Sequence, residues 1–181
     1  MKKILYVVFI AVILTSCGNE KQQKYIHNID SLYTIVDTIS NNLQQMKKDT
    51  LLLNAIKQSK NHSKALNPFL DTLFTMSSYR KRITEYMAMY KFFKKFKNHW
   101  GELYSNVEYT KKQLRDLKHD IPILLNKGDT VNTNKYLKDE TNAVKIISEK
   151  YEELKKGVSI NMNKFPEANK KITNLLDSLK Q

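Results

Sequence analysis

The chain has 181 residues, with 31 lysines and arginines against 18 aspartates and glutamates, and a formal net charge of +13. It contains four glycines, three prolines and one cysteine. So few turn residues argue against an all-β fold, and a single cysteine excludes an intramolecular disulfide. The length suits one domain with a core of its own.

The first residues have the pattern of a secretory signal. Lys2 and Lys3 precede an uncharged apolar run from Ile4 to Leu14. As a helix this run would be roughly 16 Å long, which is too short for a hydrocarbon core of about 30 Å. A charged start, a short apolar run and a small residue before a cleavage point indicate a signal peptide over residues 1–16.

The end of this segment, Leu14-Thr15-Ser16-Cys17, resembles the lipobox of bacterial lipoproteins. The resemblance implies that Cys17 becomes the first mature residue, with a diacylglycerol on its sulfur and often an acyl chain such as palmitate on its amino group. It covers residues 1–17 alone. Gly18 stands where an inner-membrane lipoprotein often has aspartate, which favours an outer membrane in a cell that has one. The alternative is an ordinary secretory signal with an incidental cysteine.

Cleavage before Cys17 would leave 165 residues with a net charge of +11. Residues 17–24 then form the lipidated cysteine and a polar tether without an apolar period. Seven extended residues reach at most roughly 25 Å, so we expect the folded part to lie close to the bilayer.

The next segments predict two helices. Apolar residues recur in steps of three and four and mark the inward face of the first: Tyr25, Ile29, Leu32, Val36, Ile39, Leu43 and Met46. Asp49-Thr50 predicts a turn and a cap, followed by a shorter helix from Leu51. The period is lost over residues 60–67.

Asn67-Pro68 predicts the start of a helix that continues to Trp100, because asparagine caps well and proline fits the first turn. Gly101 is a predicted break or kink. A further stripe runs from Leu103 to Leu124, with Pro122 expected to kink or end its helix.

Residues 126–130, Asn-Lys-Gly-Asp-Thr, predict a helix stop and a new cap. The following stripe extends from Leu137 to Val158. We then expect a connector over residues 157–165 and a last helix starting at Pro166.

These elements predict an all-α fold, an antiparallel bundle of four to five helices that forms a single domain over residues 25–181. Amphipathic helices with one apolar face must bury it against each other. The stripes are narrow, which leaves an elongated coiled-coil hairpin as the alternative.

Residues 79–100 form the candidate binding segment. One acidic residue, Glu85, lies there among seven basic residues: Arg80, Lys81, Arg82, Lys91, Lys94, Lys95 and Lys97. Basic side chains interleaved with aromatic ones can bind phosphates, anionic lipid surfaces or acidic polymers. The competing interpretation is a solvated basic face over an aromatic core. Phe92 and Phe96 widen the apolar arc, and we predict that they are exposed aromatics in contact with a partner.

The sequence offers little for catalysis or metal binding. It has no glycine-rich phosphate loop and no Gly-x-Ser-x-Gly sequence, and its one thiol is assigned to lipid. Asp116, His119 and Asp120 lie within one turn, but no two histidines are three or four residues apart, as a helical zinc site would require. We therefore expect no enzyme, no cofactor and no metal.

Two functional classes remain open. The first is a lipid-anchored envelope protein that binds another envelope protein through a helical face. The second is a module for anionic ligands, namely lipid head groups, acidic polysaccharide or, least expected, nucleic acid. Exposed Phe92 and Phe96 beside an uncharged patch would favour the first. A positive stripe across several helices would favour the second.

Overall fold

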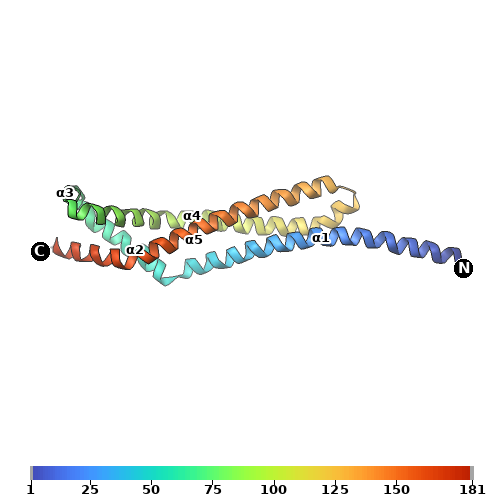
Figure 1. Ribbon diagram of the computed structural model, residues 1–181, viewed down its shortest axis with the longest axis horizontal. Coiled ribbons are helices and arrows are strands. Elements are labelled where there is room, and N and C mark those ends of the chain that lie inside the picture. Colours follow the sequence, from blue (N-terminus) through green and yellow to red (C-terminus); the bar gives the residue numbers. More distant parts are fainter. Residues whose placement is uncertain (1, 180–181) are drawn as a thin grey trace. The chain divides into compact units, whose positions relative to one another are not determined.

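The computed structural model describes the backbone of residues 2–179 and the side chains of residues 20–179. Its elements are α1 (Lys2–Lys48), α2 (Thr50–Leu66), the 3-10 helix η1 (Asn67–Phe69), α3 (Leu70–Thr75), α4 (Ser77–Asn126) and α5 (Thr130–Ser178) (Figure 1). No strand occurs in this part of the chain. The predicted all-α bundle is confirmed.

Two compact units share these helices. Unit 1 comprises Met1–Ser40 and Asn106–Ser148, and unit 2 comprises Asn41–Ser105 and Glu149–Gln181. The single domain over residues 25–181 stays a prediction. The predicted signal peptide and the Cys17 side chain lie outside the residues whose side chains are described. Among the described residues, no helix combines the length and the apolar character needed to cross a membrane.

In unit 1, α1 packs antiparallel to α4. Two ion pairs show the direction. Asp30 pairs with Lys118 (2.6 Å), and Asp37, later on α1, pairs with Lys111, earlier on α4 (2.8 Å). The predicted stripe is buried here, with Ile29, Val36, Ile39, Leu114, Leu117 and Ile121 each at most 7% exposed, while Leu32 is half-buried. Heptad spacing alone was enough to predict the buried face of each of these two helices, though not that they pack on each other.

The helix stop before α5 was also predicted correctly. Gly128 has a φ of 73°, in the left-handed region that glycine adopts without steric cost. Asp129 then caps α5, because its carboxylate accepts hydrogen bonds from the backbone and side-chain nitrogens of Asn132. The turn at residues 127–129 joins α4 to α5 (Figure 1).

In unit 2, the end of α1 and α2 pack against α4 and α5 around a core rich in aromatic residues. The Asp49 carboxylate caps α2 by accepting from the backbone N–H groups of Leu51 and Leu52, as predicted. The Trp100 indole N–H donates to the Leu43 carbonyl at 2.8 Å. Its ring stacks on that of Tyr104, with 5.0 Å between ring centroids.

Several predicted interruptions are wrong. The α4 helix runs through Gly101, and α5 runs through the expected connector at residues 157–165 and through Pro166. Proline removes one helical hydrogen bond. Phe165 and Ile172 are buried on either side of Pro166, and their packing against neighbouring helices holds both flanks in one continuous helix.

Two other boundaries differ from expectation for local reasons. The α2 helix extends through residues 60–66, because its inward face continues in small polar residues, Ser59 and Ser63, that a hydrophobic period does not register. The helix expected to run from residue 67 to 100 is divided at Met76, which has extended backbone angles (φ −85°, ψ 109°). Residues 18–24 belong to α1, so they span about 10 Å rather than their extended reach.

Candidate interaction surface

The seven basic residues of the candidate segment lie on the N-terminal half of α4, in unit 2, and all are exposed. Lys91, Lys94 and Lys95 share one face of the helix, since residues three and four apart are neighbours there. In the part of the chain that the structure describes, none of the seven forms an ion pair with a carboxylate.

The seven residues do not form a single patch. Arg80 turns back toward α3, where its Nε donates to the Phe74 carbonyl at 2.9 Å. Arg82 instead lines a groove between α4 and α5. The sequence therefore identified exposed cations correctly but did not distinguish those that face solvent alone from the one that lines a concave surface.

The prediction that Phe96 is an exposed contact residue is wrong. Phe96 is 5% exposed and belongs to the core, while Phe92 is half-buried with its ring edge-on to Phe93 at 5.8 Å between centroids. The apolar arc of α4 is wide because this helix packs on more than one neighbour. Trp100 contacts α1, Tyr86 contacts α2 and Phe93 contacts Phe165 of α5.

The Phe92 ring occupies a space that only glycine leaves free. A Cβ atom added at Gly157 on α5 would lie 2.6 Å from Cε2 of Phe92, closer than carbon atoms can approach. Glycine inside a helix costs up to about 1 kcal/mol relative to alanine. Here the absence of a side chain at Gly157 makes room for the Phe92 ring.

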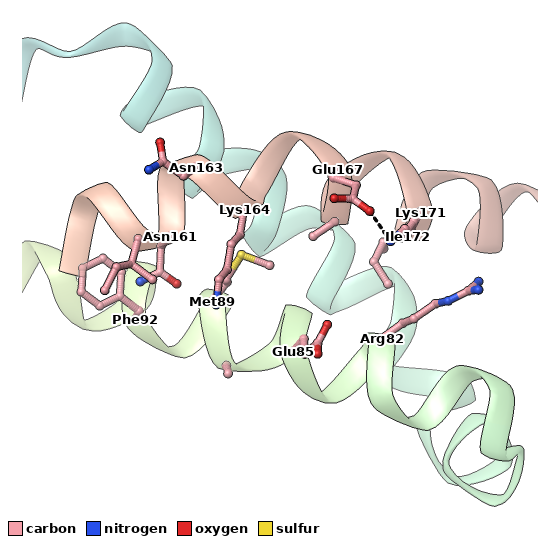
Figure 2. Close-up of a pocket in the computed structure, with 13 residues that line it drawn as sticks. Arg82, Glu85, Met89, Phe92, Asn161, Asn163, Lys164, Glu167, Lys171 and Ile172 are labelled. Carbon is pink, nitrogen blue, oxygen red and sulfur yellow. Dashed lines mark hydrogen bonds and ion pairs between the residues drawn. The ribbon is translucent and has the colours of Figure 1, made fainter. Parts of the chain in front are cut away.

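A groove of about 510 Å³ runs along α4 and α5 within unit 2 (Figure 2). Its walls mix apolar and charged residues: Arg82, Glu85, Ala88, Met89 and Phe92 from α4, and Ile160, Asn161, Asn163, Lys164, Glu167, Ala168, Lys171 and Ile172 from α5. A smaller hollow of about 220 Å³ continues it past Arg82 and Lys171 toward Tyr79 and Ser178.

Three basic and two acidic side chains line the groove, and two of them pair with each other. Glu167 and Lys171 pair with each other along α5, and this hydrogen bond holds the pKa of the Glu167 carboxyl below its usual range. Arg82, Lys164 and Glu85 are the other charged residues that line it (Figure 2). The α5 side of the groove was missed from the sequence, because much of it lies in the expected connector. The packing of Phe92 against Gly157 could not be predicted from the sequence of α4 alone, because Gly157 lies on α5.

A chain of polar side chains links α2, α4 and α5 in unit 2, from the buried Tyr86 to the exposed Gln58. The hydroxyl of Tyr86, which is fully buried, donates to Oδ1 of Asn169 at 3.2 Å and lies 2.9 Å from Nδ1 of His62. The Asn169 amide nitrogen donates to Gln58 at 3.0 Å. Burial raises the pKa of the Tyr86 phenol well above its ordinary value, so it remains a donor.

The residues weighed for metal binding lie on the surface of unit 1. Nδ1 of His119 is 3.2 Å from a carboxylate oxygen of Asp120, and both side chains are exposed. Among the described residues, no three histidine, cysteine, aspartate or glutamate side chains are grouped as metal ligands would be.

Formal charge separates the two units sharply. Unit 2 contains 19 lysines and arginines against 9 aspartates and glutamates, a net +10. Unit 1 contains 12 against 9, a net +3 that includes Lys2 and Lys3 of the predicted signal peptide. Most of the net positive charge of the chain therefore belongs to unit 2. Comparisons with protein-family models, with curated proteins and with solved structures gave no match to this chain.

Proposed function

We propose that the protein is a lipid-anchored interaction module of the cell envelope, whose unit 2 binds an acidic partner protein. Binding rather than catalysis is the proposed activity. The observation that carries the proposal is the net charge of +10 on unit 2, with the seven basic residues of α4 exposed and without carboxylate partners in the described chain. Such a surface raises the rate of encounter with an acidic partner.

The anchor rests on the resemblance of Leu14-Thr15-Ser16-Cys17 to a lipobox. More than one acyl chain on Cys17 would hold the protein firmly in a membrane, whereas one chain binds only marginally. Replacing Cys17 with serine should remove acyl labelling by palmitate and move the protein from the membrane fraction to the soluble fraction. A variant that remains with membranes after a high-salt wash would contradict lipid anchoring.

The partner is tested by crosslinking in intact cells followed by mass spectrometry, with an amine-reactive reagent that reaches the exposed lysines. The full chain should crosslink to one envelope protein, through segments rich in aspartate and glutamate. Exchanging Lys91, Lys94, Lys95 and Lys97 for arginine removes the reactive amines while keeping the charge, so the partner should still copurify under non-denaturing conditions. Exchanging the same four for glutamine should abolish copurification without changing the helical circular dichroism spectrum.

An anionic lipid surface or acidic polymer is the second candidate. It is favoured by exposed lysines that share one face of α4, Lys91, Lys94 and Lys95, on a protein proposed to lie close to a bilayer. Each basic residue near an anionic surface contributes about 1 kcal/mol. The unlipidated protein, residues 18–181, should then bind vesicles containing anionic lipid at low salt and dissociate at high salt. If it ignores both such vesicles and acidic polymers, including nucleic acid, the second candidate is excluded.

A further inference from the structure

We infer that the groove between α4 and α5 in unit 2 is the docking seat for an acidic amphipathic helix of the partner. This inference rests on the proposed function and makes it more specific. The exposed lysines explain attraction at a distance, but they lie on a convex helix surface. The groove is where a partner can be held in one orientation.

The dimensions of the groove suit a helix. Along α4 its lining extends from Tyr79 to Phe92, and along α5 from Ile160 to Ser178. Thirteen helical steps span about 20 Å, so a partner helix of about 13 residues would lie along its whole length. Helices bind grooves of this kind through apolar residues spaced three and four apart.

The floor and the rims differ in chemistry. Met89 and Ile172 are buried at its base, and the half-buried Phe92 ring closes one end (Figure 2). Arg82 on α4 and Lys164 on α5 offer cations from opposite walls, and they outnumber Glu85, the one carboxylate of the lining besides Glu167, which pairs with Lys171. An apolar stripe flanked by carboxylates would therefore match both the floor and the rims.

The far side of this helix pair is already covered. In Figure 2 the segment coloured teal, which includes α2, passes behind α4 and α5, and its His62 lies against Tyr86 and its Gln58 against Asn169. A partner helix in the groove would give α4 and α5 a helix on their open side as well. The net charge of +10 on unit 2 disfavours a second copy of this chain as the occupant, because like charges repel.

The shape of the groove depends on Gly157. Any side chain at this position displaces the Phe92 ring, whose Cε2 atom would lie 2.6 Å from the new Cβ. The ring must then move, and with it the wall of the groove that it forms. Gly101 provides a matched control, because it is also a helical glycine of unit 2 and a Cβ there meets no atom within 4 Å.

The experiment places a photo-crosslinking amino acid at Ala88, which is exposed and lines the groove, and separately at Ala65, an exposed alanine of α2 that does not line it. In intact cells, Ala88 should crosslink to a helical, acidic segment of one protein, and Ala65 should not. Adding Gly157→Ala should reduce that adduct about tenfold, corresponding to 1.4 kcal/mol, while Gly101→Ala should leave it unchanged. Circular dichroism of both variants checks that they remain folded.

Charge is tested with a second matched pair. Arg82→Gln and Lys81→Gln remove the same charge from neighbouring exposed positions, but Arg82 lines the groove and Lys81 does not. Arg82→Gln should weaken the Ala88 adduct more strongly. Equal effects, adducts with lipid, or adducts with a second copy of the chain would overturn the inference. A protein captured through the lysine face but never through Ala88 would overturn it while leaving the proposed function intact, whereas no protein adduct from any position would refute both.

Discussion

The two units differ in how they use their charges. In unit 1, Lys111 and Lys118 form ion pairs with Asp37 and Asp30 across the α1–α4 seam, and the buried Ser40 hydroxyl donates to Glu108 at 2.7 Å. In unit 2, the ion pairs Lys155–Glu152 and Lys171–Glu167 join neighbours on α5, while the neutral side chains of Tyr86, Asn169 and Gln58 link three helices.

This difference bears on the surface proposed for binding. Unit 1 uses its charged residues to join its own helices. Burial lowers the pKa of Lys111, but its hydrogen bond to Asp37 and the charge of Glu108 outweigh that effect, so its pKa lies above the usual value and it remains charged. Unit 2 packs its helices through aromatic rings and amide side chains, and the seven basic residues of the candidate segment stay exposed on α4.

The largest predicted effect breaks the aromatic core of unit 2. Phe93 is 1% exposed and packs edge-on against Phe165. Phe93→Ala should lower the free energy of unfolding by about 3–5 kcal/mol. Leu114→Ala in unit 1, where the side chain is fully buried, should cost about 2–5 kcal/mol. Denaturant unfolding followed by circular dichroism measures both, and fluorescence of Trp100 reports on unit 2. A loss below that range for Phe93→Ala would contradict its place in a packed core.

A smaller loss of stability is expected when the chain of polar side chains Tyr86–Asn169–Gln58 in unit 2 is broken. Tyr86→Phe keeps the ring but removes the hydroxyl that donates to Asn169 and contacts His62. Asn169 and His62 are half-buried, so the loss of this hydroxyl should cost about 0.5–1.5 kcal/mol, as for a typical hydrogen bond. Thr84→Val, at an exposed position of the same helix, is the control and should change stability little. Equal stability of wild type and Tyr86→Phe would show that the chain of hydrogen bonds contributes nothing.

The contrast in charge predicts opposite responses to neutralisation. Asp30→Asn removes the ion pair with Lys118 in unit 1 and should cost about 0.2–1 kcal/mol at low salt, with the loss shrinking as salt is added. Lys94→Gln in unit 2 removes a charge that repels its neighbours and should leave stability unchanged or slightly higher. Melting temperatures at low and high salt measure both, and the comparison fails if the two substitutions respond alike.

The smallest effect concerns Glu140 in unit 1. Partial burial, with a further contribution from the charge of Asp139, raises the pKa of its carboxyl above the ordinary 4.5. The folded state therefore favours the protonated form, and stability is lost as the pH rises through this pKa. Glu140→Gln should raise the melting temperature slightly at about pH 7 and not at about pH 3. An identical shift at both pH values would exclude the ionisation as its cause.

Local patterns in the sequence determined the all-α class, the caps at Asp49 and Asp129, and the buried faces of the two helices of unit 1 that contain Val36 and Leu114. The heptad spacing, the cap at Asp49 and the positive φ of Gly128 each depend on residues within one or two helical turns of each other. The exposure of the basic residues on α4 was predictable for the same reason, because charge favours solvent wherever the helix lies.

Only the tertiary structure decided the features that depend on neighbouring helices. Packing carries α5 through Gly157 and Pro166, both of which favour interruption in an isolated helix. Phe96 is buried because α4 packs on more than one neighbour, so its apolar arc is wider than a single seam requires. One wall of the groove is the Phe92 ring, which fits against Gly157, 65 residues away in the sequence, across two helices. No local rule connects such a pair, since their complementarity arises only when α4 and α5 pack side by side.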